Sequence, residues 1–197
     1  PGGAPATSQA VLDTIRDVIP LSEEDSYLSW QTVATLPDGQ QVLVTGTPKD
    51  MIDSEVQALR MAGINPRMLD LKAMALIRAV NREQALILNI EPSSFDIVIV
   101  AGGVTEVMHT SVLPPPGDLS LEERVERLAV ALELAVGFYN THHPGSSLDP
   151  ATPLFITGQM SGDLALMEGL QARVGYPIES LKPPLDYPVN LPVSQYA

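Results

Sequence analysis

The stretch "ALILNIEPSSFDIVIVAGGVTEVMHTSV", residues 85–112, decides the fold. Two apolar runs flank the short polar turn "EPSS", and a second turn, "AGG", leads into a third, alternating run. Runs of this length that are rich in β-branched residues and bounded by Pro, Gly and Ser are typical of strands joined by tight turns. The stretch therefore predicts three consecutive antiparallel strands, and a helix anywhere within 85–100 would contradict that prediction.

A long helix is predicted after these strands, at residues 119–142. Ser120 and Glu123 have the spacing of a capping box, which satisfies the first free N–H groups of a helix. The remaining pattern predicts a strand at 152–159, a helix at 161–175 closed by Gly175, and a short strand at 177–181. Three antiparallel strands followed by parallel strands with helical crossovers define an α/β lobe of the RNase H-like type.

The first 80 residues predict a separate small α/β subdomain. A helix is expected at 8–19, with Ser8 as N-cap and Pro20 as its stop. A hairpin follows, with strands at 27–36 and 41–46 around "PDG". The later elements are a helix capped by Thr47, with Pro48 at its first position and its end at Gly63, a short strand at 65–71, and a connecting helix at 72–80. We therefore divide the chain into residues 1–80 and 81–197.

The composition narrows the classes of function. The 197 residues contain no Cys, which removes disulfides, thiol catalysis and thiolate metal sites, and fits a reducing compartment. The formal net charge is −13, so the surface repels phosphate backbones and anionic lipids and disfavours nucleic acid and direct membrane binding. No apolar run approaches the ~20 residues that span a bilayer, and we expect no signal peptide at the start of the chain.

Two longer stretches resemble a known family. Residues 42–80 and the preceding 18–33 are similar to the PilM branch of the FtsA-like, actin-fold proteins. "ALILNIEPSSFDIVIVAGG" is similar to that family's second phosphate hairpin, and "PLFITGQMSGDLALMEGLQARVGYPIESL" to its adenosine-motif region. The resemblance runs from about Ala10 to the end, where "LPVSQYA" matches the approach to a final helix. The positions that match within 42–80 are Arg60, Ala62, Gly63, Pro66, Asp70, Ala75, Leu76, Arg78 and Ala79.

The resemblance implies an actin-like fold without its first nucleotide lobe. We therefore expect a fragment, the inserted small subdomain plus the second lobe. It also implies a cytoplasmic scaffold of type IV pilus or related secretion machinery, held at the inner membrane through a partner. That partner is a PilN-like membrane-anchored protein, which offers a short cytoplasmic segment. Self-association stays open.

The nucleotide site that the resemblance implies is altered. Asn89 stands where the family has a metal-holding Asp, and Glu91 where it has a phosphate-facing Gly. A carboxylate 4–6 Å from a phosphate repels it by roughly 3–4 kcal/mol at an effective dielectric of ~20. Ser93 and Ser94 keep hydroxyl donors. In the adenosine region Gly158 and Gly162 remain, but Ser161 and its neighbours interrupt the usual glycines. We expect a lost or weak site, no catalytic residue and no hydrolysis.

The alternative that stays open beside the scaffold is an ATP-binding FtsA-like protein that polymerises or switches with nucleotide. A sugar kinase of the same superfold needs a catalytic Asp beside the phosphates, and none stands out. A metal site at His142 and His143 is disfavoured, because adjacent helical residues point about 100° apart. No cofactor is expected for this stretch, and ATP with Mg²⁺ stays open for a longer chain.

The predicted partner surface lies in the small subdomain, at residues 8–71. The hairpin at 27–46 supplies strands and the helix at 49–62 a neighbouring wall. The acidic run Glu23, Glu24 and Asp25 precedes the hairpin. Membrane-anchored proteins often carry basic residues on their cytoplasmic side, so a basic segment would be attracted there.

Overall fold

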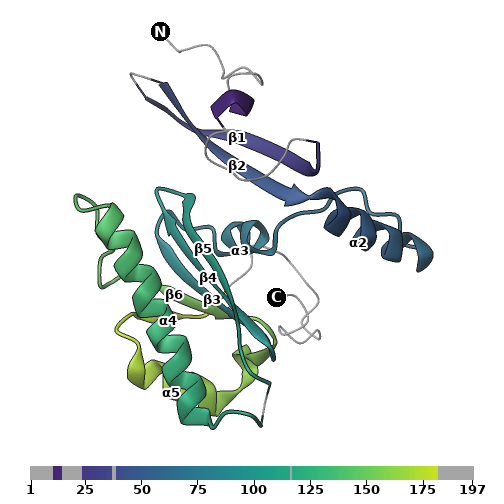
Figure 1. Ribbon diagram of the computed structural model, residues 1–197. Coiled ribbons are helices and arrows are strands. Elements are labelled where there is room, and N and C mark those ends of the chain that lie inside the picture. Colours follow the sequence, from purple (N-terminus) through teal and green to yellow (C-terminus); the bar gives the residue numbers. More distant parts are fainter. Residues whose placement is uncertain (1–10, 15–23, 37–38, 116, 182–197) are drawn as a thin grey trace. The chain divides into compact units, whose positions relative to one another are not determined.

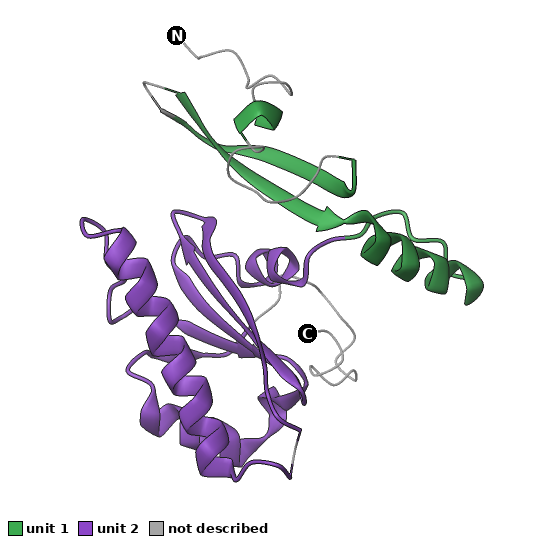
Figure 2. Ribbon diagram, in the orientation of Figure 1, with its two compact units in different colours: residues 1–69 green, residues 70–197 purple. Residues whose placement is uncertain are grey.

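The computed structural model describes residues 11–14, 24–36, 39–115 and 117–181 (Figure 1). The chain forms two compact units, residues 1–69 and 70–197 (Figure 2). The division lies before α3 (Lys72–Val80), whereas the sequence suggested a boundary after it. The reason is that Ala73, Leu76 and Val80 are buried against the sheet of the second unit.

The second unit is built on a five-stranded mixed sheet in the order β5-β4-β3-β6-β7. Residues 85–112 form the three predicted antiparallel strands, which confirms that prediction. The long helix that follows and the later strands are also confirmed. The elements are β3 (Ala85–Ile90), β4 (Ser94–Ala101), β5 (Val104–Val112), α4 (Leu121–His142), β6 (Leu154–Thr157), α5 (Leu164–Arg173) and β7 (Ile178–Glu179).

Both faces of this sheet are covered, which explains why β3 is apolar at nearly every position. Leu86, Leu88 and Ile90 join the core beneath α4 and α5, while Ala85 and Ile87 face α3. All six residues of β3 are buried. Strand β6 lies parallel to β3, and β7 parallel to β6; α4 is the crossover helix that leads from β5 to β6, and α5 the one from β6 to β7. The α3 side is thus covered by one helix and the opposite side by two (Figure 1).

The helix ends agree in part with the sequence patterns. The capping box of α4 is present, since the Ser120 hydroxyl accepts from the Glu123 N–H at 3.2 Å and the Glu123 carboxylate accepts from the Ser120 N–H at 2.8 Å. The predicted closure of α5 at Gly175 is wrong, because the helix ends at Arg173 and its C-cap residue, Val174, is already extended, with φ of −84° and ψ of 139°. The helix also begins later than predicted, at Leu164 instead of residue 161, because a 3₁₀ turn, η1 (Gln159–Gly162), precedes it.

The first unit contains the predicted hairpin and helix. Strand β1 (Ser26–Leu36) pairs antiparallel with β2 (Gly39–Pro48), and α2 (Lys49–Met61) follows. Thr47 is not the cap of α2, because it pairs with Tyr27 in the hairpin and the N-cap position falls on Pro48. Gly63, with φ of 81°, closes α2 in the left-handed conformation as predicted.

Two further predictions in this unit have different outcomes. Residues 65–71 form no strand, because Pro66 lacks an N–H and no strand lies beside them among the described residues. Of the helix at 8–19, residues 11–14 are helical, and Ser8 and the rest lie outside the described residues. No helix among the described residues has the length and apolarity needed to cross a membrane.

Candidate functional site

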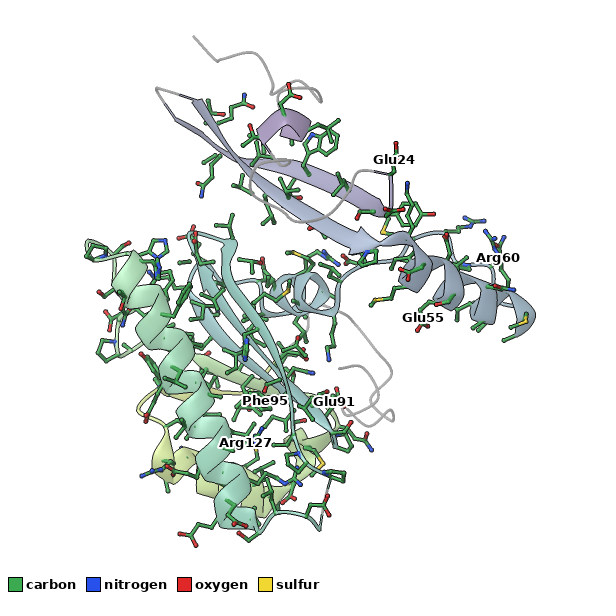
Figure 3. All side chains as sticks on the ribbon, in the orientation of Figure 1. Glu24, Glu55, Arg60, Glu91, Phe95 and Arg127 are labelled. Atoms are coloured by element: carbon green, nitrogen blue, oxygen red, sulfur yellow. The ribbon has the colours of Figure 1, made fainter. Side chains whose placement is uncertain are left out.

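The candidate site lies at the carboxyl ends of the parallel strands β3 and β6. This is the end of an open α/β sheet where ligands usually bind. The β3–β4 turn is closed by a hydrogen bond from the Glu91 N–H to the Ser94 carbonyl oxygen at 2.9 Å, which leaves Pro92 and Ser93 at its tip. Glu91 lies at this end of the sheet (Figure 3).

Gly158 lets the end of β6 approach β3 closely. Its φ is 89°, and a Cβ there would lie 2.5 Å from the Ile90 carbonyl oxygen and 2.8 Å from the Ile90 nitrogen. No side chain fits between two backbones at that distance. Gly162 has no such requirement, because a Cβ there would meet nothing within 4 Å. The loop from Gly158 thus passes directly beside the β3–β4 turn.

Asn89 is buried and bound on all sides by other side chains. Its amide nitrogen donates to Asp96 Oδ2 at 2.9 Å and to Glu91 Oε1 at 3.3 Å. Its Oδ1 accepts from the Thr157 hydroxyl at 3.0 Å. An Asn amide has two N–H donors, so both are used within the protein. Asn89 therefore links β3 to β4 and β6 and has no donor left for a ligand.

Asp96 is the charged centre of this network. It is 5% exposed and lies opposite Asn89 in the β3–β4 register. Its carboxylate accepts from the Thr110 hydroxyl at 2.7 Å and pairs with the Lys72 ammonium at 2.6 Å. Burial alone would raise the pKa of Asp96, but hydrogen bonds from Lys72, Thr110 and Asn89 lower that pKa below its ordinary value. Asp96 is therefore held as a carboxylate under the sheet end.

Glu91 bridges the two turns of the site. One carboxylate oxygen accepts from Asn89, and the other accepts from the backbone N–H of Gln159 at 3.4 Å. Gln159 is the first residue of the 3₁₀ turn η1, where free N–H groups are available to an anion. The protein's own carboxylate thus occupies a position suited to a bound anion.

The structure brings together Asn89, Glu91 and Gly158, three of the predicted site residues. Ser161 turns back on its own loop, because its hydroxyl donates to the Gly158 carbonyl oxygen at 2.7 Å. Ser93 is exposed at the tip of the turn, and Ser94 begins β4.

Sequence reasoning missed four members of the network: Lys72, Asp96, Thr110 and Thr157. A signal for one was present, since Asp96 is the single charged residue in the apolar run "FDIVIVA".

The two adjacent histidines end α4. The Nδ1 atoms of His142 and His143 lie 2.8 and 3.0 Å from the carbonyl oxygens of Phe138 and Tyr139. His143 Nε2 lies 3.5 Å from a Glu106 carboxylate oxygen. His109 lies in the middle of β5. Within the described residues, no group of three His, Asp or Glu side chains has the arrangement of a metal site.

No family model matches the chain, and no curated protein matches it either. Among solved structures, the chain is similar to one described as a "PilM-PilN type IV pilus biogenesis complex". The two are 18% identical with a TM-score of 0.52, and the match covers 91% of this chain and 64% of that chain. This chain therefore spans less than two thirds of the length of that relative. The chain has an actin-like fold.

Two other solved structures are more weakly similar. One is the ethanolamine utilization protein EutJ from Carboxydothermus hydrogenoformans, with a TM-score of 0.49 and 13% identity over 68% of this chain and 57% of that chain. The other is a Bacteroides thetaiotaomicron protein of unknown function with an actin-like ATPase fold, with a TM-score of 0.44 and 11% identity over 88% of this chain and 61% of that chain.

Proposed function

We propose that this chain is part of a PilM-type, actin-like scaffold protein of type IV pilus or related secretion machinery. In this proposal it works in the cytoplasm and binds a short cytoplasmic segment of a PilN-like membrane-anchored protein. The observation that carries the proposal is the shared fold over 91% of the chain with the PilM-PilN complex. The network around Asn89 supports a scaffold rather than an enzyme, because it leaves the site at the sheet end occupied by protein groups.

The first unit offers a surface suited to a peptide. Helix α2 has no buried residue, although its sequence carries several apolar side chains. Methionine side chains are flexible and adapt to varied partners. The two-stranded sheet also has free outer edges among the described residues, to which an extended peptide backbone can add. Among the described residues of the unit, the exposed large apolar side chains are Tyr27, Met51, Met61, Ile64, Met68 and Leu69.

The charge of this unit favours a basic peptide. The backbone carbonyl oxygens of Glu24 and Asp25 accept from Lys49 at 2.5 and 2.8 Å, which ties the acidic residues to the start of α2. Asp53 on the same helix accepts from the Tyr27 hydroxyl at 2.9 Å. The Asp53 carboxylate thus lies beside the exposed Tyr27, where lysine or arginine of a peptide can approach it. Salt screens such pairs, with a Debye length of ~8 Å at 0.15 M.

The test is a chemical-shift titration of the chain with the cytoplasmic peptide of a PilN-like protein. We expect shifts clustered in residues 24–69, and weaker binding as salt rises. Met51→Glu should reduce the affinity roughly tenfold, which corresponds to the loss of one apolar anchor. Leu164→Glu, which changes an exposed apolar residue of the second unit, is the matched control and should leave the affinity unchanged. Shifts confined to 85–181 would refute the proposed partner surface.

We propose further that the nucleotide site is degenerate and that the chain does not hydrolyse ATP. The support is chemical. Glu91 brings negative charge to the turn that would face phosphate, and both amide hydrogens of Asn89 are used internally. Calorimetric titration with Mg-ATP should show no submillimolar binding, and phosphate release should stay at background. Binding or turnover above these levels would favour the FtsA-like alternative. Asn89→Asp combined with Glu91→Gly should improve binding only in a longer chain that carries the first lobe.

A further inference from the structure

An apolar groove runs along the outer edge of the second unit, between β5 and α4. Its volume is about 620 Å³. Phe95 and the β5 residues Val107, His109 and Ser111 line one side, while α4 supplies the other. Among the described residues that line the groove, Arg127 is the one with a fixed charge, and no carboxylate is among them, although the chain carries a net charge of −13. The described lining of the groove therefore carries no negative side chain, in contrast to the acidic chain as a whole.

Helix α4 has two apolar stripes. The first is buried against the sheet and contains Leu128, Leu132 and Val136. The second consists of Val130, Leu134 and Phe138, four residues apart, which are 40%, 69% and 57% exposed. All three line the groove and therefore face the β5 edge of the sheet. A helix that is apolar on two sides needs two partners, and the structure supplies one of them.

Strand β5 is an edge strand. It pairs with β4 on one side, and no described strand pairs with its other side. Its outer N–H and C=O groups can pair with a further strand, except the Val112 carbonyl oxygen, which accepts from Arg127. Val107, His109 and Ser111 of this strand line the same groove as the second stripe of α4. The open backbone edge and the second stripe of α4 thus form one continuous surface.

We propose that this surface binds a second copy of the chain by antiparallel pairing of the two β5 strands. The sheet then continues across a two-fold axis, and the two α4 helices pack side by side over it. Strands lie about 4.8 Å apart, and α4 contacts both β4 and β5, so the two helices would be separated by about two strand spacings. That is within the range of about 8–10 Å for packed helices.

The positions of charged residues along β5 support this occupant and fix the register. Arg127 projects from the start of α4 and donates to the Val112 carbonyl oxygen at 3.3 Å (Figure 3). At the other end, Glu106 of β5 pairs with His143 at the end of α4. An antiparallel pair centred on His109 places Val112 of one copy opposite Glu106 of the other. Arg127 of each copy then meets Glu106 of the other, so two complementary pairs form.

The two-fold axis through His109 also suits the exposed apolar stripe of α4. Helix α4 runs from Val112 towards Glu106, antiparallel to β5, so its middle lies beside His109. The stripe is symmetric about Leu134, since Val130 and Phe138 are each four residues away. In an antiparallel helix pair centred on Leu134, Val130 of one copy therefore packs against Phe138 of the other. A two-fold interface requires such self-complementarity, and the strand and the helix give the same centre.

Sedimentation equilibrium of the full chain over a concentration series tests the association. We expect a monomer–dimer equilibrium that strengthens as salt rises, because two chains of charge −13 repel each other at long range. Leu134→Glu should weaken dimerisation by roughly tenfold or more, since it places two charges at the centre of the interface. Leu164→Glu alters a residue that is 77% exposed outside the surface and should have no effect. A monomer at every concentration and salt level overturns the proposal and leaves the groove to a different protein.

Single cysteines test the register, because the chain has no Cys of its own. Directly opposed residues in an antiparallel pair have Cα atoms about 4.5–5.5 Å apart, within the reach of a disulfide. His109→Cys should therefore form a disulfide-linked dimer under mild oxidation. Val112→Cys, on the same strand but away from the axis, should not. Equal cross-linking of both variants, or of neither, overturns the pairing. Neither experiment uses the PilN-like peptide. The proposed dimer and the proposed peptide-binding surface can therefore each be refuted without the other.

Discussion

At the scale of single residues, the candidate site is a set of polar groups that satisfy one another. Asp96 lies beneath the sheet end and receives hydrogen bonds from Lys72, Thr110 and Asn89. Unpaired buried charge is costly, so each of these donors contributes to keeping Asp96 ionised. Asn89 is equally occupied, and Glu91 reaches the η1 turn. The polar residues that would hold a ligand in an open site instead hold β3, β4 and β6 together.

The lowered pKa of Asp96 predicts a specific dependence of stability on pH. A carboxylate whose pKa is lower in the folded state stabilises that state above its unfolded pKa of about 3.9, and this contribution is lost as the pH falls through the folded pKa. Asp96→Asn should therefore reduce the free energy of unfolding by about 1–3 kcal/mol at pH 7. The difference from the unmodified chain should shrink as the pH falls below about 4.

Urea unfolding at a series of pH values measures this difference. Asp118→Asn, which changes an exposed carboxylate of the same unit, is the matched control and should alter stability by no more than about 0.5 kcal/mol. A deficit in Asp96→Asn that stays constant from pH 7 to pH 3 would mean that the ionised form is not what stabilises the fold.

Some of these residues could be predicted from the sequence and others could not. Asn89, Glu91 and Gly158 fall at turns that the strand pattern locates, so their convergence follows once the strands are placed. The Lys72–Asp96 pair joins α3 to β4 across residues that are distant in the sequence. Such a pair depends on which face of the sheet α3 covers, and the local pattern does not contain that information. Thr110 and Thr157 are ordinary strand residues by type, and only the register identifies them.

At the scale of elements, local patterns predicted best where several signals agree. The three strands at 85–112 combine apolar runs with turn residues, and α4 combines a capping box with a long apolar stripe. The wrong predictions of elements are those that depended on a single sequence feature. Thr47 has the chemistry of a cap, but its pairing with Tyr27 in the hairpin prevails. Residues 65–71 have an apolar character without a neighbouring strand to pair with, so they form no strand.

The junction of β6 with η1 gives a prediction about how elements pack. Gly158→Ala should destabilise the second unit by about 1–3 kcal/mol or more, because φ is positive and the new Cβ would clash with the backbone of Ile90. Gly162→Ala, four residues later in the same turn, meets open space and should change stability by no more than about 0.5 kcal/mol. Thermal unfolding of both variants measures the contrast. Equal effects would show that the β6–η1 loop does not depend on its close approach to β3.

At the scale of the whole molecule, the two units differ in how much apolar surface they bury. In the second unit, both faces of the sheet join clusters of buried side chains. In the first unit, Val11 and Ser26 are the buried residues among those described, and α2 buries none. Hydrophobic burial is the dominant favourable contribution to folding. The first unit therefore has little local stability of its own, which suits a surface that becomes ordered on a partner.

This difference predicts the pattern of hydrogen exchange. Amides of β3, β4 and β6 should exchange only through global unfolding of the second unit, whereas those of β1, β2 and α2 open through local fluctuations. We expect protection in the first unit to be lower by at least about tenfold, which corresponds to about 1.4 kcal/mol in opening free energy. Mass spectrometry of exchanged peptides measures both units in one sample. Addition of the PilN-like peptide should slow exchange in β1, β2 and α2 and leave β3 unchanged. Equal protection of both units without the peptide would contradict the prediction, because it would require the first unit to unfold only together with the sheet.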